Sequence, residues 1–439
     1  MKIFFSVGEP SGDIHGANLI RGLKSEYARV MAERNLSAEE YPPLQCMGFG
    51  GEKMAAEGCE IHFDLTSLAV MWVAQVLWNI RKFFALADQA EAFFRESRPD
   101  AVILIDYPGF NWHIARRAKK YGIPVYYYSP PQIWAWMSCR VKKMKKWVDL
   151  VFSGLPFECR WLQKHGCCVE YVGHPFFDEV RNSSGDTELT HRLQKMKMSD
   201  VEGAERKMIA LLPGSRTQEV KQNFATFLNV IPLILKSVPD VFFVVAPFRE
   251  KHAQMIYQMM KKKAEKDVAF RDYFQTQGVM VISGHAAEII QQAYICLSVS
   301  GSVSLELLYY EKPSVITYRV GRIGWWLQWF FRKVKYITLV NLLLAENPFR
   351  NYNGEYHPRS ADRQEVLFPE YLSCVDRSEW IAEEMVHWLT DKAAYSQAIR
   401  RLQELKSRVA YAGAAQKAAK IILEREMCTT TDSGLSARS

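Results

Sequence analysis

The sequence predicts an α/β protein made of two successive parallel sheets that are covered by helices. Short apolar, β-branched runs alternate with segments of helical apolar spacing through most of the 439 residues,. The series begins again after Gly173-His174-Pro175, and the polar segment 181–186 follows as a surface linker,. We therefore expect two Rossmann-like domains facing a central cleft.

The expected elements follow this alternation. In the first half, strands are predicted at 2–7, 44–48, 101–105, 124–128, 149–153 and 168–172, and helices at 14–34, 73–97, 111–121 and 156–165. In the second, strands are predicted at 207–212, 241–246, 279–282, 294–298 and 313–317, and helices at 217–236, 251–265, 285–292 and 302–310. We expect domains at 1–173 and 174–375, C-terminal helices at 376–425, and a disordered tail at 426–439.

The composition is ordinary for a globular protein, with 49% hydrophobic and 24% charged residues,. A net charge of +8 favours a negatively charged partner: nucleotide phosphate, nucleic acid or anionic lipid,. Nine cysteines without a Cys-x-x-Cys pair fit reduced thiols,. The first residues are too short an apolar run for a signal peptide, and no run is long enough to span a bilayer. We expect a cytoplasmic protein that can rest on a membrane surface.

The segment from Gly8 to Ala17 is the most informative stretch, because it turns a buried strand directly into a helix. Its glycines permit a tight turn and close approach of a ligand. Ser11 or Asp13 is expected to cap the helix, and Glu9 and His15 are titratable groups at its start. The alternative is a tight strand-to-helix turn without a ligand.

Two further motifs follow strands of the second half. The strand 207–212 leads into Ser215 and Arg216, whose guanidinium is suited to phosphate or uracil,. Ser300-Gly301-Ser302 opens a helix whose free N–H groups favour a diphosphate, and Glu306 is placed to accept from ribose hydroxyls. The alternatives are a helix start with an exposed arginine and a common Ser/Gly turn.

In the first half, Asp106 follows the strand 101–105, where a carboxylate can act as a general base toward a sugar hydroxyl,. Helix capping is its alternative role. Trp134 and Trp136 follow the next strand and offer an aromatic wall, with core packing as the alternative for each.

Together these motifs resemble the lipid-A-disaccharide synthase family. The matching segments, in the family's order, are Gly8 to Asp13, Leu68 to Met71, Asp106 to Asn111, Trp134 to Trp136, Gly173 to Pro175, Leu212 to Arg216, and Ser300 to Ser302 with Leu305-Glu306. Gln75 stands where the family usually has Glu, and Val340 replaces a proline, which leaves the acceptor contacts open.

The resemblance implies a GT-B fold and an inverting glycosyltransferase. Its donor would be UDP-2,3-diacylglucosamine, its acceptor 2,3-diacylglucosamine 1-phosphate, and its products UDP and the β-1,6-linked disaccharide. Asp106 would be the base, with Glu9 or His15 as the other candidates. The implied substrate-binding residues are Ser11, Ser215, Arg216, Ser300, Gly301, Ser302, Glu306 and Asn341.

Two aromatic segments are edged by cations. Residues 71–84 and 325–335 each have a narrow polar stripe beside a wide apolar face, and a basic cluster occupies 140–146. Such helices suit a lipid headgroup layer, and anionic lipid attracts the cations. A buried domain core is the alternative. The expected membrane residues are Trp72, Trp78, Trp325, Trp326 and Trp329, which places the enzyme at the inner face of the cytoplasmic membrane.

No Asp-x-Asp pair or His cluster occurs in these motifs, so we expect neither a metal nor another cofactor. A UDP-sugar epimerase or hydrolase, which uses the same scaffold, is the second hypothesis. A non-catalytic lipid- or nucleotide-binding protein is the third. Nucleic-acid binding is disfavoured because the basic cluster is short and lacks a recognised module. The sequence leaves the oligomeric state and the role of 346–364 open.

Overall fold

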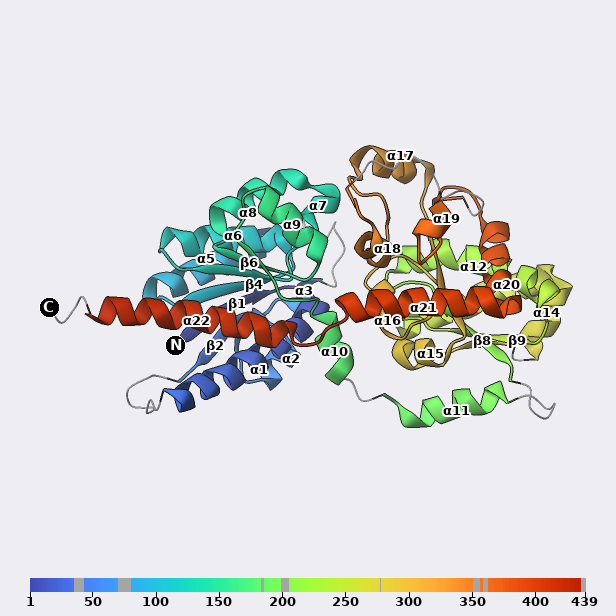
Figure 1. Ribbon diagram of the computed structural model, residues 1–439, viewed down its shortest axis with the longest axis horizontal. Helices are drawn as coiled ribbons and strands as arrows, with labels where there is room; N and C mark the ends of the chain where they lie inside the picture. The colour runs from blue at the N-terminus through green and yellow to red at the C-terminus, as the bar shows by residue number, and fades with distance from the viewer. Residues whose placement is uncertain are drawn as a thin grey trace. The chain divides into compact units, whose positions relative to one another are not determined.

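A computed structural model describes residues 1–34, 43–69, 80–182, 185–198, 205–276, 278–349, 356–357 and 362–435. The chain divides into two compact units (Figure 1). Unit 1 consists of Met1–Asn182 and Ala410–Ser439, and unit 2 consists of Ser183–Val409.

Unit 1 contains a seven-stranded parallel sheet. Its strands, in spatial order, are β3 (Glu60–Asp64), β2 (Gln45–Gly50), β1 (Lys2–Val7), β4 (Ala101–Ile105), β5 (Val125–Tyr128), β6 (Leu150–Ser153) and β7 (Val169–Tyr171). The strand order reverses its direction between β1 and β4, where Val7 pairs with Ile105 at the carboxyl ends. In open α/β sheets, this switch point is where ligands bind.

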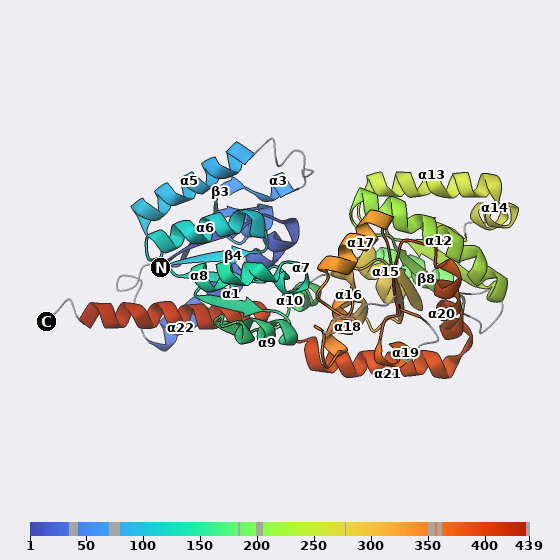
Figure 2. The same ribbon diagram turned by 90° about the horizontal axis from the view of Figure 1, so that it is seen from above.

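Helices cover both faces of this sheet. They are α1 (Pro10–Glu33), α2 (Glu52–Ala56), α3 (Thr66–Ala69), α5 (Ile80–Ser97), α6 (Pro108–Lys120), α7 (Ile133–Trp136), α8 (Val141–Trp147), α9 (Pro156–Lys164), α10 (Phe176–Asn182) and α22 (Ala414–Leu435). Alternate residues of β1 enter opposite cores: Phe5 packs with α1 and α22, whereas Phe4 packs with α5 and α6,. In the view of Figure 2, α22 runs beside α1, with which it packs closely.

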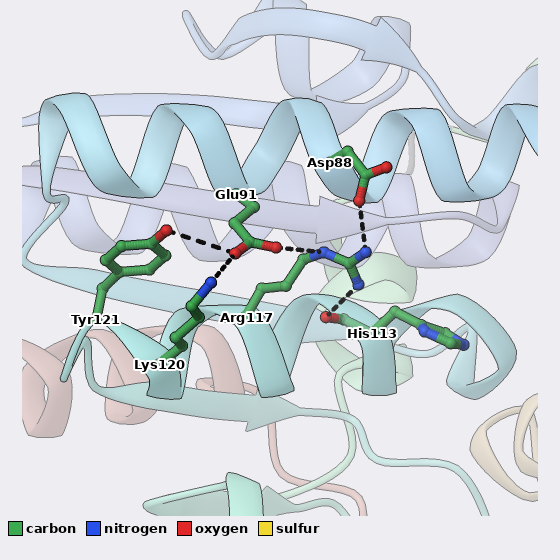
Figure 3. Close-up of polar contacts among 6 residues, drawn as sticks. All are labelled: Asp88, Glu91, His113, Arg117, Lys120 and Tyr121. Carbon is green, nitrogen blue, oxygen red and sulfur yellow. Dashed lines mark hydrogen bonds and ion pairs between the residues drawn. The ribbon is translucent and has the colours of Figure 1, made fainter.

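An ion-pair network joins α5 to α6 on the outer side of unit 1 (Figure 3). Arg117 of α6 contacts both Asp88, at 2.6 Å, and Glu91, at 3.1 Å. Lys120 adds a second cation to Glu91 at 2.6 Å, and the Tyr121 hydroxyl donates to the same carboxylate at 3.4 Å. These contacts fix α5 on α6, which begins at Pro108, two residues after Asp106.

Unit 2 repeats the architecture with a six-stranded parallel sheet. Its strands, in spatial order, are β10 (Val279–Val281), β9 (Val241–Val245), β8 (Lys207–Leu212), β11 (Ile295–Ser298), β12 (Ser314–Arg319) and β13 (Glu370–Ser373). Its helices are α11 (Thr187–Lys197), α12 (Thr217–Ser237), α13 (Glu250–Lys266), α14 (Val268–Gln275), α15 (Ala286–Gln292), α16 (Val303–Tyr309), α17 (Arg322–Phe331), α18 (Leu339–Leu344), α19 (Asp362–Glu365), α20 (Ser378–Thr390) and α21 (Lys392–Val409). The switch point lies between β8 and β11.

The α/β class and every predicted strand are confirmed, with ends that differ by at most two residues. The edge strands β3 and β13 and the helix α11 were not predicted. β3 is Glu-Ile-His-Phe-Asp, a polar and partly exposed segment that lacks the apolar run of a buried strand,.

The predicted domain limits need correction. The first unit continues past 173 through α10 to Asn182, and the helices at 376–425 do not form a separate part. α20 and α21 belong to unit 2, whereas α22 returns to unit 1. Residues 426–435 also do not form the predicted disordered tail, because α22 extends to Leu435: the Tyr126 hydroxyl donates to Glu426, and Met427 is buried in the core.

Asp178 joins the two segments at which the chain leaves and re-enters unit 1. Its carboxylate accepts from the backbone N–H of Gly413 and, at 2.8 Å, from that of Ala415. The side chain is therefore the N-terminal cap of α22, supplied by α10. This contact anchors the returning helix on the first unit.

We predict that Asp178→Ala lowers the free energy of unfolding by about 1–3 kcal/mol, because two N–H groups at the start of α22, that of Ala415 buried, lose their acceptor,. Urea unfolding followed by circular dichroism measures the loss. The matched control is Asp186→Ala, which removes a partly exposed cap with one bond, to Leu189 N at 3.0 Å. An equal loss in both variants would contradict the assigned role of Asp178.

Candidate functional site

Glu9 and Asp106 follow the two strands that flank the switch point of unit 1. The glycines between them permit close packing. A Cβ on Gly8 would overlap the ring of Tyr107, and one on Gly12 would lie 2.9 Å from Val7 Cγ1 and 4.0 Å from Asp106 Cβ. The start of α1 therefore packs directly on the end of β4. The glycines of this segment are thus also needed for packing.

Asp106 has an unusual backbone conformation. Its φ is +47°, and that of Tyr107 is +45°, both in the left-handed region. Ser129, after the neighbouring strand β5, has a φ of +52°. Non-glycine residues in this region are uncommon, and such strain concentrates at functional sites.

Hydrogen bonds hold the backbone of Asp106 in place. Its carbonyl oxygen accepts from Asn111 Nδ2 and from the Tyr127 hydroxyl, each at 2.7 Å. Asn111 Nδ2 also lies 3.2 Å from the carbonyl oxygens of Ser6 and Ile105, and its Oδ1 accepts from Ser6 Oγ at 2.7 Å. Asn111 is fully buried, and its carboxamide connects the ends of β1 and β4.

The carboxyl group of Asp106 has a pKa near neutral pH. Its pKa is raised from 3.8 to about 7, chiefly because it is withdrawn from water and secondly because of the negative charges of Glu9 and Glu158,. A general base works best when its pKa lies near the working pH. Glu9 is exposed at the N-cap of α1.

His15 differs from the other two candidate bases. It is 7% exposed, its Nδ1 has no hydrogen-bond partner, and burial lowers its pKa to about 4. The pKa of His174 is lowered to about 3 by burial and by His15. Both imidazoles are therefore neutral at pH 7, and His15 is a weaker base than Asp106.

Ser11 is exposed in the first turn of α1, where a ligand can reach it. Neither it nor Asp13 caps this helix, which corrects the prediction: the N-cap is Glu9 and makes no side-chain hydrogen bond. Asp13 instead accepts from the N–H groups of Gly51, Lys53 and Met54 at 2.9–3.2 Å. It therefore caps α2, and the first N–H groups of α1 receive no side-chain cap.

Glu158 is a residue of this region that the sequence analysis missed. Its carboxylate is 3% exposed and accepts from Trp134 Nε1 at 2.8 Å and from Ser153 Oγ at 2.7 Å. Burial raises its pKa to about 7. Trp134 is thus a core residue, whereas Trp136 is 49% exposed. A glutamate in the first turn of a helix is common, so the sequence held no signal for this role.

In unit 2, the two predicted motifs lie at the switch point. β8 leads into Gly214, Ser215 and Arg216, and β11 leads into Ser300, Gly301 and Ser302. Gly214 has a φ of +103°, and its Cβ would lie 3.0 Å from Val299 Cγ2, so the two loops are in contact.

The cation of Arg216 is exposed and forms one ion pair, to Glu219 at 3.2 Å. Glu219 also accepts from the Tyr318 hydroxyl at 3.2 Å. An exposed ion pair of this kind is weak, so the guanidinium is available to an anionic ligand.

The second loop has an open backbone. Gly301 has a φ of +155°, and nothing lies within 4 Å of the position a Cβ would take. Ser302 is exposed, whereas Ser300 donates to the Ile337 carbonyl at 2.8 Å. Glu306 lies one turn into α16 and is half-buried.

Asn341 does not fit the substrate-binding role predicted for it. It is 1% exposed, and its Nδ2 donates to Phe368 O at 2.7 Å and to Glu370 Oε2 at 3.0 Å. Its Oδ1 accepts from the N–H groups of Leu367 and Phe368, each at 3.1 Å. The carboxamide is occupied within the protein and orders the segment before β13.

The structure describes only some of the aromatic residues that were predicted to contact the membrane. Trp72 and Trp78 lie outside the described residues. Trp325 is half-buried in α17, Trp326 is 59% exposed, and the side chain of Trp329 is not described. Within the described ranges, no helix combines the length and apolarity needed to cross a bilayer. The same ranges hold no cluster of three or more metal-ligating side chains.

We predict that Asp106→Asn stabilises the protein more at pH 8 than at pH 5. A carboxyl whose pKa is raised by folding stabilises fully below its unfolded value, near 3.8, and this contribution is lost as pH rises through about 7,. Asparagine carries no charge and tolerates a positive φ. Thermal unfolding at both pH values should show an extra gain of a few degrees at pH 8. An equal gain at both would contradict the raised pKa.

Comparison with known proteins identifies relatives of this chain by sequence. Relatives named lipid-A-disaccharide synthase include one from Myxococcus xanthus (strain DK1622), 29% identical over 96% of this chain and 97% of its own length. Another, from Aliivibrio fischeri (strain MJ11), is 29% identical over 92% of this chain and 98% of its own length.

Solved structures share the fold at low sequence identity. S. aureus MnaA in complex with UDP has a TM-score of 0.59 at 12% identity, covering 97% of this chain and 96% of its own. UDP-GlcNAc 2-epimerase from Neisseria meningitidis, bound to UDP-GlcNAc, has a TM-score of 0.54 at 12% identity. The match covers 98% of this chain and 100% of the epimerase chain. These likenesses establish a GT-B-type fold and no more.

The family is decided by sequence. The family model described as lipid-A-disaccharide synthetase matches residues 3–387, which include both switch points and every motif at them. The chain therefore belongs to the lipid-A-disaccharide synthase family of glycosyltransferases.

Proposed function

We propose that the enzyme joins UDP-2,3-diacylglucosamine to 2,3-diacylglucosamine 1-phosphate, with Asp106 as the general base. The observation that carries this assignment is the raised pKa of a carboxyl group whose backbone is held at positive φ, at the switch point of unit 1. Among the three candidates, Asp106 combines basicity near pH 7 with access to a ligand: His15 is buried and weakly basic, and Glu9 lies at an exposed helix start.

The proposed reaction is a single displacement with inversion. The 6-hydroxyl oxygen of the acceptor bonds to the anomeric carbon of the donor, while the bond from that carbon to the UDP oxygen breaks. Asp106 takes the hydroxyl proton, and the electron pair of the broken bond stays on the diphosphate. The products are UDP and the β-1,6-linked disaccharide 1-phosphate.

We assign UDP binding to unit 2. Arg216 is an exposed, permanently charged donor, and Ser215, Gly301 and Ser302 present accessible backbone and hydroxyl groups at the neighbouring loop. Such donors stabilise the charge that builds on a leaving diphosphate. Glu306, half-buried in α16, is suited to accept from the ribose hydroxyls.

We predict that Asp106→Asn lowers kcat about 10²- to 10⁴-fold, the usual contribution of a general base, while UDP affinity is unchanged. Mass spectrometry of the lipid product and calorimetry with UDP measure the two quantities. In the unaltered enzyme, kcat/KM should rise with pH up to about 7, because the base must be ionised. Near-normal turnover of the variant would transfer the role to Glu9 or His15.

We further propose that the enzyme rests on an anionic membrane surface, where its diacylated substrates reside. In unit 1, the exposed Trp136 and Met137 adjoin exposed lysines on α8. In unit 2, α17 exposes Ile323 and Trp326. Apolar side chains beside cations favour insertion into a headgroup layer.

We predict that replacing Trp325, Trp326 and Trp329 by Ser weakens binding to vesicles containing anionic lipid, because apolar surface available to the headgroup layer is lost. Vesicle co-sedimentation measures this. The control is Phe248→Ser, which removes an exposed aromatic ring in the β9–α13 loop. If the triple variant binds as the control does, α17 is not part of the membrane surface.

A further inference from the structure

The backbone conformation at Asp106 has an unfavourable free energy that other contacts must offset. Two consecutive non-glycine residues with positive φ cost of order 1–3 kcal/mol each,. A relaxed turn after β4 would point the carboxyl group elsewhere, since rotation about φ redirects the Cα–Cβ bond. The contacts that maintain this conformation therefore decide where the carboxylate lies.

Those contacts converge on one atom. The carbonyl oxygen of Asp106 accepts from the Tyr127 hydroxyl of β5 and from Asn111 Nδ2 of α6, both at 2.7 Å. Tyr127 and Asn111 are each 0% exposed, so water does not compete for these bonds. The Ser6 hydroxyl of β1 orients the carboxamide by donating to Asn111 Oδ1 at 2.7 Å.

We propose that Tyr127 and Asn111, with Ser6 behind Asn111, are positioning residues that hold Asp106 in its left-handed conformation for proton transfer. This proposal rests on the assignment of Asp106 as the base. None of the three side chains needs to touch the substrate, because each acts through the backbone of Asp106. Two of the three lie outside the motif at 106–111, on neighbouring strands.

The protonation state of Tyr127 suits this role. Burial, followed by the negative charge of Asp106, raises the pKa of its hydroxyl well above the ordinary value of 10. The hydroxyl therefore remains a donor across the working pH range. The charged and titratable groups around Asp106 are Glu9, Tyr107, Glu158 and, near Tyr127, Arg140.

The experiment compares Tyr127→Phe with Tyr128→Phe. Both substitutions remove one oxygen from a buried tyrosine of β5, but the Tyr128 hydroxyl has no hydrogen-bond partner. We expect Tyr127→Phe to lower kcat about threefold to tenfold, the equivalent of one hydrogen bond, with the KM for the UDP-linked donor unchanged. Tyr128→Phe should leave kcat within a factor of two.

A second pair of variants distinguishes a loss of positioning from a loss of the folded structure. Ser6→Ala removes the hydroxyl behind Asn111 and should lower kcat about threefold to fivefold, and Tyr127→Phe/Ser6→Ala should lower it further. Thermal unfolding and UDP affinity are measured for each variant. A fall in melting temperature with unaltered kcat in the folded fraction would overturn the positioning role and leave only a structural one.

Asp106→Asn, measured in parallel, separates this inference from the assignment of the base. If Asp106→Asn retains turnover, the base itself is misassigned. If it abolishes turnover while Tyr127→Phe and Ser6→Ala match Tyr128→Phe, the base stands and the positioning role is wrong.

Discussion

The carboxamide of Asn111 is the contact on which the arrangement of unit 1 depends. Backbone groups at the carboxyl ends of parallel strands lose their ladder partners, and buried carbonyls without partners are costly. Asn111 supplies donors to the ends of β1 and β4 and to the loop that follows β4. One buried side chain thus joins the two strands of the switch point, and Glu9 and Asp106 leave these strands at fixed positions.

The packing of α1 adds a second constraint at the same place. Gly8 contacts the ring of Tyr107, Gly12 contacts Val7, and Gly16 contacts Met54, each at a distance that leaves no room for a Cβ. A side chain at Gly8 would press on the Tyr107 ring, and one at Gly12 would press on Val7 of β1, so larger residues at these two positions would push the start of α1 away from the sheet. The long helix begins without a side-chain cap, because its N-cap residue Glu9 makes no side-chain hydrogen bond and Asp13 is engaged by α2 instead. N–H groups that are not capped in the protein are the groups that an anionic ligand can use.

Much of the fold was predictable because its signals are local. Buried parallel strands such as β4 and β8 are continuous apolar runs, and their residue limits match the predictions,. That the residues following β1 and β4 lie at the same edge of the sheet follows from parallel topology, since all carboxyl ends share one edge,. The long-range partners were not predictable. Asn341 looked available for a ligand within Leu-Val-Asn-Leu-Leu, yet its amide serves backbone groups 26 and 27 residues later.

The charges at the two switch points match the two halves of the proposed reaction. At unit 1, burial and the negative charges of Glu9 and Glu158 raise the affinity of the Asp106 carboxyl group for protons, which suits proton removal from a sugar hydroxyl,. At unit 2, the exposed arginine Arg216 suits the opposite demand of the proposed reaction, negative charge accumulating on a diphosphate,. A basic carboxyl is costly to keep in a folded protein at neutral pH, because folding withdraws it from water while the unfolded chain ionises it freely. Its retention at a strained backbone position, held by three buried side chains, is therefore better explained by chemistry than by stability.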